Sequence, residues 1–176
     1  GGQCEGREDQ NQGAGVMKKI VIGVAAASLA TTSANAEGDF IVTAADPQGM
    51  VDVLEGAGYD PVLGTDKTGD PRITMLFGGR EGVLFFYGCD ENTNDKCDAV
   101  QFNIGFDRKQ PWKADDALKL SEKFRFVAPT LDNEGDPFIS WDVITGNGIP
   151  AKVFLRSVLA FNNIVRDVET VVFADE

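Results

Sequence analysis

The sequence predicts an α+β fold in which an antiparallel sheet is accompanied by three helices, in the order α-β-β-β-β-α-β-β-α. Four short stretches with strand-like alternation follow one another without a helix between them, and two more follow later. Three other stretches repeat apolar residues at helical spacing. Because consecutive strands joined by short turns pair antiparallel, this pattern favours an α+β domain over a parallel α/β sheet.

The first helix is predicted to begin at Asp46-Pro47 and to end near Gly56 and Gly58. Aspartate is a good N-cap, proline fits the first helical position, and glycine readily follows a helix end. The spacing of the apolar residues predicts which face of this helix is buried. That face is expected to comprise Met50, Val53, Leu54 and Ala57.

The middle of the chain predicts most of the sheet. Strands are expected at residues 60–64, 72–77, 83–88, 99–106, 126–131 and 138–144. In the fourth of these, the alternation places Val100, Phe102, Ile104 and Phe106 on one side. A second helix is expected over residues 113–124, with Ala117, Leu120 and Phe124 facing inward.

The last and longest helix is predicted over residues 151–173. Its apolar stripe comprises Phe154, Val158, Phe161, Val165, Val168 and Val172, and is widened by Leu155, Leu159, Ile164 and Val171. Valine is a modest helix former, so packing must supply most of this helix's stability. The stripe is broad enough to cover a sheet and also a second subunit, so a homodimer is expected.

A six-residue pattern occurs twice, at residues 66–71 (DKTGDP) and 132–137 (DNEGDP). Aspartate and glycine are spaced as the first and fourth residues of a type I turn, with the glycine left-handed as in a hairpin with a bulge. The proline then begins a strand, where its missing N–H matters least. A nucleotide-binding loop is the rival interpretation, but it needs a Gly-Lys pair that the chain lacks. Both copies are therefore predicted to be hairpin turns.

Residues 17–36 carry the parts of a secretory signal peptide. Residues 17–19 (MKK) form a basic start, residues 20–30 an apolar region, and residues 34–36 (ANA) a cleavage site. The apolar region is shorter than the roughly 20 residues that span a bilayer. We therefore expect cleavage after Ala36 and a periplasmic or secreted protein without a stable membrane anchor.

Residues 1–16 precede Met17 and are interpreted as a non-native or gene-model extension, which includes the lone Cys4. Residues 37–176 are then expected to form a single domain. A chain of that size can bury about two thirds of its unfolded surface.

The chain has a net charge of −12. Residues 37–176 keep all of it, because the preceding residues contain equal numbers of basic and acidic side chains. Such a field repels nucleic acid and anionic lipid head groups. No nucleic-acid partner is expected, whereas basic partners or cations suit the surface.

Histidine is absent, which removes the commonest general base and zinc ligand. Ser121, Ser140 and Ser157 lie in no G-x-S-x-G or S-x-x-K context. The adjacent Asp115 and Asp116 point apart on a helix and are typical of solvated charges at its N-terminus. The sequence therefore predicts no enzyme, with no catalytic residues, no cofactor and no metal.

Cys89 and Cys97 are the two cysteines after the predicted cleavage site. An exported protein meets an oxidising compartment, where an even number of cysteines usually forms disulfides. The pair brackets a polar stretch between two predicted strands. A structural disulfide between Cys89 and Cys97 is therefore predicted.

The same loop partly matches the sequence pattern of a calcium site. Asp90, Asn92 and Asn94 match the first three oxygen ligands of an EF-hand loop. However, Asp95 replaces the glycine and Gln101 the bidentate glutamate. A polar hairpin loop is the favoured interpretation.

Five stretches in order resemble one known family: ADPQGMVDVLEGAGY, TGDPRI, LFFYGCDENTNDKCDAVQFNIGFD, KFRFVAPTLDNEGDPFISWDV and the closing amphipathic helix. Together they resemble the YbjN domain family, whose members are described as bacterial sensory transduction regulators. The resemblance runs from about Ala44 to Phe173. One departure concerns the second helix, where relatives often carry Asn-x-Trp-Asn before Arg-Phe. Here Arg125-Phe126 is present, but Leu118, Leu120 and Ser121 occupy the other positions.

The family is similar in fold to type III secretion chaperones. The resemblance therefore implies a chaperone-like α+β fold and a role in binding protein, and it brings no catalytic residues. It also implies cytosolic action for many relatives, which the leader contradicts here. The expected function is that of a non-enzymatic exported accessory or regulatory factor that binds another protein or peptide. The alternative is a periplasmic module that binds a small ligand or cation at the loops around Asp90 and Asp132.

Overall fold

The structure, a computed structural model, describes residues 40–176. The predicted extension and signal peptide, residues 1–36, lie outside the described residues. The helices are α1 (Pro47–Gly56), α2 (Ala114–Lys123) and α3 (Ala151–Val172). The strands are β1 (Ile41–Val42), β2 (Val62–Thr65), β3 (Pro71–Phe77), β4 (Arg80–Tyr87), β5 (Ala99–Gly105), β6 (Ala128–Leu131), β7 (Pro137–Ile144) and β8 (Ile149–Pro150).

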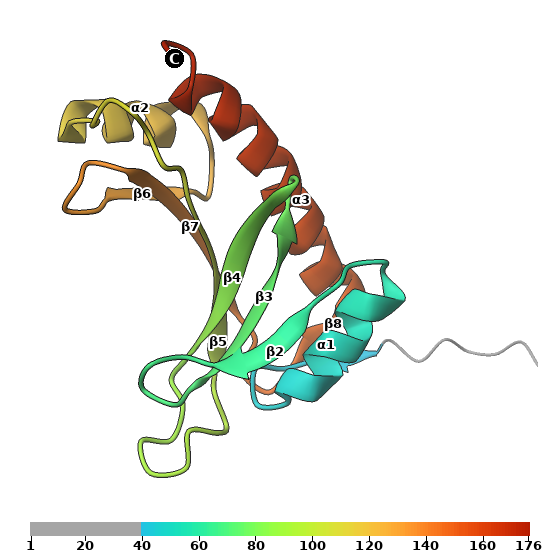
Figure 1. Cartoon of the computed structure of the whole chain (residues 1–176). Coiled ribbons are helices and arrows are strands. Elements are labelled where there is room, and N and C mark those ends of the chain that lie inside the picture. Colours follow the sequence, from blue (N-terminus) through green and yellow to red (C-terminus); the bar gives the residue numbers. More distant parts are fainter. Residues whose placement is uncertain (1–39) are drawn as a thin grey trace, which may run out of the picture. The chain divides into compact units, whose positions relative to one another are not determined.

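Six strands form one antiparallel sheet in the order β2-β3-β4-β5-β7-β6, which confirms the predicted α+β class. Register follows from the alternation, since one face of each central strand is buried. Phe102 of β5, for example, lies opposite Leu84 of β4 and Trp141 of β7. Figure 1 shows α3 crossing one face of this sheet.

Aromatic side chains fill the space between α3 and the sheet. Phe154 and Phe161 of α3 contact the ring of Phe102, with centroids 6.1 and 5.4 Å apart. Phe161 also meets Phe77 edge to face at 5.0 Å. Such pairs add about 0.5–1.5 kcal/mol each beyond the area they bury. The predicted stripe of α3 is confirmed, because each of its six principal residues is fully buried.

Two details of the predicted apolar pattern are wrong. Ala57 is the C-cap of α1 and is exposed, while Val51 is buried in its place. Phe126, expected in a strand, precedes β6 with a backbone φ of 65° and is 67% exposed. Its ring lies 5.1 Å from that of Trp141. Stacking on a neighbouring aromatic ring thus takes the place of the strand pairing that was expected there.

A second, two-stranded sheet was not predicted. β1 pairs antiparallel with β8, and each has two residues, too few for an alternation to be visible in the sequence. The buried Thr145 hydroxyl accepts a hydrogen bond from Ala44 N–H at 2.8 Å and donates to the Asp98 carbonyl at 2.9 Å. This side chain joins the N-terminal segment to the central sheet.

Both copies of the repeated pattern are hairpin turns, as predicted. The glycines are left-handed, with φ of 97° at Gly69 and 84° at Gly135. In the first copy the Asp66 carboxylate accepts hydrogen bonds from three backbone N–H groups, those of Thr68, Gly69 and Asp70. Proline begins the following strand in each case.

Asn162, buried on α3, joins three elements. Its side-chain oxygen accepts a hydrogen bond from Gly78 N–H in the β3–β4 turn at 2.9 Å. Its amide nitrogen donates to the Tyr59 hydroxyl, between α1 and β2, at 3.0 Å. Gly78 has a φ of 61°, and a Cβ there would lie 2.9 Å from the Asn162 carbonyl oxygen. The turn therefore approaches the helix as closely as only glycine allows.

Replacing this side chain should destabilise the protein. We expect Asn162→Ala to lower the free energy of unfolding by about 1–3 kcal/mol, because the Gly78 N–H and the Tyr59 hydroxyl lose their partner. Asn163→Ala is the matched control, since Asn163 is adjacent, of the same type and exposed. It should change stability by less than about 0.5 kcal/mol. Urea denaturation of both variants checks this, and equal losses would contradict it.

Candidate functional site

Cys89 and Cys97 are joined in a disulfide that closes the β4–β5 loop. The loop also contacts the first hairpin turn, which the sequence did not predict. The Asn94 side-chain amide donates to the Thr68 carbonyl and to the Asp70 carboxylate, each at 3.0 Å. Asn94 itself is left-handed, with φ of 56°. The disulfide loop and the β2–β3 turn thus form one end of the sheet.

The loops suggested as cation sites use their carboxylates internally. Asp90 accepts hydrogen bonds from the N–H groups of Asn92 and Thr93, and Asp132 from those of Glu134 and Asp136. The pairing of β5 places the two loops at opposite ends of the sheet, because Ala99 lies opposite Ile144 and Gly105 opposite Phe138. Within residues 40–176, no three His, Cys, Asp or Glu side chains are grouped to hold a metal ion.

The serines named in the sequence are also separated. The Ser140 hydroxyl donates to the Ala128 carbonyl, and the Ser157 hydroxyl to the Val153 carbonyl one turn earlier in α3. Ser121 lies exposed on α2. Asp116, beside Asp115, accepts a hydrogen bond from Lys113 N–H at 3.2 Å and pairs with Lys119 at 2.8 Å. These groups do not converge on a common position.

A groove of about 400 Å³ runs between α2 and the edge strand β6. It is lined by Ala114, Ala117, Leu118, Ser121, Pro129, Thr130 and Leu131. Leu118 is 59% exposed, whereas Ala117 is buried at the base of the helix. Pro129 lacks an N–H to offer a further strand, which protects this edge from strand addition. The groove therefore offers apolar side-chain contacts rather than backbone pairing.

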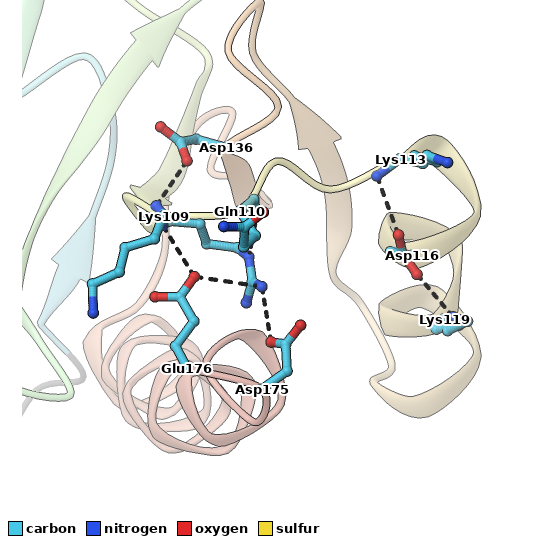
Figure 2. Close-up of polar contacts among 9 residues, drawn as sticks. Lys109, Gln110, Lys113, Asp116, Lys119, Asp136, Asp175 and Glu176 are labelled. Atoms are coloured by element: carbon cyan, nitrogen blue, oxygen red, sulfur yellow. Dashed lines mark hydrogen bonds and ion pairs between the residues drawn. The ribbon is translucent and has the colours of Figure 1, made fainter.

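The segment between β5 and α2 is held by the end of the chain, as Figure 2 shows. The guanidinium of Arg108, whose side chain is 1% exposed, donates to Asp175 at 2.8 Å and lies 3.4 Å from a Glu176 carboxylate oxygen. Lys109 N–H donates to the same Glu176 oxygen at 3.0 Å. The Trp112 ring packs against the guanidinium, 5.2 Å from its centre. We call Arg108, Lys109, Trp112, Asp175 and Glu176 the C-terminal clamp.

A second arginine contacts the end of α3. Arg80 pairs with Glu169 at 2.7 Å, and its guanidinium lies 5.4 Å from the ring centre of Phe106 and 5.0 Å from that of Phe173. These cation–π contacts place the Arg80 guanidinium against aromatic rings, while its ion pair with Glu169 remains partly exposed to solvent. Arg80 therefore fixes the last turn of α3 to the sheet, and Arg108 holds the residues that follow it.

Hydrogen bonding lowers the pKa of four aspartates at or near the surface below the ordinary 3.8. The main donors are the Thr68 hydroxyl for Asp66, the Asn92 N–H for Asp90, the Lys119 ammonium for Asp116 and the Arg108 guanidinium for Asp175. Burial raises the pKa of Tyr87 above its ordinary value. The lowered pKa values belong to carboxylates that hold loop turns, the start of α2 and the clamp.

Sequence reasoning did not identify the clamp. Arg108 follows a strand in an unremarkable polar stretch, and its carboxylate partner Asp175 is 67 positions away. Only the topology brings the two residues together, because the C-terminal ends of β5 and α3 lie at the same end of the sheet. The acidic residues at the end of the chain were the one available signal, and taken alone they resemble any solvated terminus.

Comparison with protein families identifies one that covers most of the described residues. The family model of YbjN, described as "Putative bacterial sensory transduction regulator", matches residues 46–173. A comparison of the chain with curated proteins found no match. No helix in the described part of the chain has the length and apolar character needed to cross a bilayer.

Removing the disulfide should lower stability. Closing a loop of this length is worth about 2.5 kcal/mol in the chain-entropy model. We expect the double variant Cys89→Ser, Cys97→Ser to lose roughly that free energy of unfolding, measured by urea denaturation. Dithiothreitol should lower the midpoint of the wild-type protein only. A midpoint of the double variant that also falls with dithiothreitol would contradict this assignment.

Stability should fall in acid. A carboxylate whose pKa is lowered by folding binds fewer protons in the native than in the unfolded state, so it stabilises the fold above its ordinary pKa. That contribution is lost as the pH falls from 3.8 through the lowered values of Asp66, Asp90, Asp116 and Asp175. Denaturation in urea between pH 5 and pH 2 should show the decline. A free energy of unfolding that is constant or rises across this range would refute it.

Proposed function

Because the chain belongs to the YbjN family, described as bacterial sensory transduction regulators, we propose that it is a non-enzymatic regulatory or accessory factor that binds another protein or peptide. The carrying observation is the apolar groove between α2 and β6. It is open to a side chain from outside, and its exposed Leu118 would be covered by a partner. Burying an apolar side chain of that size contributes about 1.5–3 kcal/mol.

The composition of the groove indicates the chemistry of the partner. Apolar residues line it, so an apolar side chain of the partner would enter it. The chain as a whole carries a net charge of −12. A segment with basic residues flanking an apolar anchor would therefore be attracted at long range. Such a peptide is the partner that this surface suits.

The groove also contains two of the three positions at which α2 departs from the pattern of its relatives. Leu118 and Ser121 line it, whereas Leu120 is fully buried in the core. At Leu118 and Ser121 the departure therefore alters a surface, and at Leu120 it alters the core. We infer that this chain selects a partner with more apolar character than asparagine at the two groove positions would.

Export is part of the proposal. The leader at residues 17–36 and the Cys89–Cys97 disulfide, which suits an oxidising compartment, support action in the periplasm or outside the cell. The homodimer expected from the broad stripe of α3 stays a prediction. Val153 and Leu159 are the large apolar residues of α3 exposed on its outer side that such a contact would cover.

A substitution in the groove tests the proposal. Leu118→Asp should abolish partner capture, because a carboxylate in an apolar interface loses its hydration without gaining a partner. The tagged protein would be crosslinked mildly in intact cells and purified from the periplasmic fraction. Leu76→Asp is the matched control, since Leu76 of β3 lies outside the groove and is 59% exposed, as Leu118 is.

The expected result is a crosslinked protein that is common to the wild type and Leu76→Asp but lost from Leu118→Asp. The same set of captured proteins with both variants would refute a role for the groove. Recovery of the protein from the cytosol with its leader uncleaved would refute export.

A further inference from the structure

The C-terminal clamp contains an arginine with an unused donor. Within residues 40–176, two buried side-chain polar atoms have no hydrogen-bond partner, Arg80 Nε and Arg108 Nη1. Leaving a donor of a charged group unpaired in the interior is more unfavourable than leaving a neutral donor unpaired. The side chain of Arg108 is 1% exposed, so water does not compensate readily.

The groups around this arginine form a receptor for carboxylates. The Arg108 guanidinium offers Nη2, now on Asp175, and the unused Nη1. Lys109 adds a backbone N–H, which Glu176 occupies. The Trp112 ring forms an aromatic wall. Planar guanidinium donors combined with a backbone amide are well suited to carboxylates, because charge-assisted bonds are stronger than neutral ones.

The receptor is positioned by residues other than those that fill it. Arg108 N–H donates to the Asp136 carboxylate at 2.8 Å, and Arg108 Nε donates to the Gln110 carbonyl at 2.9 Å. Trp112 N–H donates to the Gly135 carbonyl at 2.9 Å. These bonds do not involve the C-terminal residues. The arginine therefore keeps its place when those residues leave.

The occupant is attached mainly through its side chains. Asp175 and Glu176 lie beyond the end of α3, where the Asp175 side chain is 69% exposed and that of Glu176 is 11% exposed. The backbone bonds from Ala174 and Glu176 back to the helix are long, at 3.4 and 3.3 Å. Release of these residues leaves the buried stripe of α3 intact. An outside carboxylate could then take their place.

We propose that the clamp is a binding site for an acidic peptide segment, filled in this structure by the chain's own Asp175 and Glu176. The fitting ligand is a pair of adjacent acidic residues, as in Asp175 and Glu176. This site is distinct from the groove of the proposed function. The attached tail competes at high effective concentration, so binding to the intact chain is weak.

The probe is the peptide acetyl-VVFADE-amide, which reproduces residues 171–176, compared with acetyl-VVFANQ-amide. Both are titrated calorimetrically into the full chain and into the variant Asp175→Asn, Glu176→Gln. The variant should bind the acidic peptide at least about tenfold more tightly than the wild type, because its own tail competes poorly. It should bind the amide peptide at least about tenfold more weakly than the acidic one.

Two controls isolate the guanidinium. Adding Arg108→Lys to the variant should weaken the acidic peptide at least about tenfold, since lysine keeps the charge but not the planar donors. Adding Asp116→Asn to the same variant, which removes a surface ion pair with Lys119 outside the clamp, should leave binding of the acidic peptide unchanged. Circular dichroism checks folding. If Arg108→Lys does not fold, the difference between the acidic and the amide peptide in binding to the tail variant is the test of the site.

The site is refuted if the tail variant binds neither peptide, or if it binds both equally. The second result would mean that the apolar residues, and not the carboxylates, are recognised. Loss of peptide binding in Leu118→Asp with the clamp intact would place the peptide in the groove, and would likewise overturn this inference without affecting the proposed function.

Discussion

The packing of α3 against the six-stranded sheet is the interaction on which the rest of the structure depends. A helix of 22 residues extends about 33 Å, enough to cross the whole sheet. Phe154 and Phe161 pack against the aromatic side chains of the strands. The Asn162 side chain accepts a hydrogen bond from the Gly78 N–H in the turn that meets the helix. Without this helix the buried face of the sheet would be exposed to water. Both ends of α3 also anchor other elements, the short β1–β8 pair at its start and the clamp at its end.

The proposed binding surface exists because α3 does not cover the edge of the sheet. Figure 1 shows α2 beside β6, away from the central strands. Ala117 and Leu120 close the space beneath α2, but Leu118 faces the solvent above the groove. Because the core packs around one long helix, the edge strand β6 and the short helix α2 remain at the periphery of the domain. Binding surfaces are commonly found on such peripheral elements held by a rigid scaffold.

Features that depend on neighbours in the sequence could be predicted, and those that depend on topology could not. The hairpin turns follow from Asp-x-x-Gly, and the buried stripe of α3 follows from its period of 3.6 residues. The contact of Asn94 with Asp70 and that of Arg108 with Asp175 join positions far apart, and no local pattern marks them. Phe126 was misplaced because its apolar character suggested a strand, while the ring of Trp141 supplied a different partner. The groove was missed for the same reason, since its two walls belong to separate elements.

Both proposed surfaces meet at the short segment that joins β5 to α2. Arg108 fixes the start of this segment in the clamp, and its far end leads to Ala114, which lines the groove. At the start, Arg108 and Lys109 are adjacent, and Asp107 and the Asp136 carboxylate balance their charge. The tail carboxylates occupy the Arg108 guanidinium and the Lys109 N–H. The long-range field of this acidic chain repels a carboxylate from the proposed site. Binding there therefore depends on short-range hydrogen-bond geometry. The specificity of such a site lies in the planar donors of Arg108 rather than in net charge.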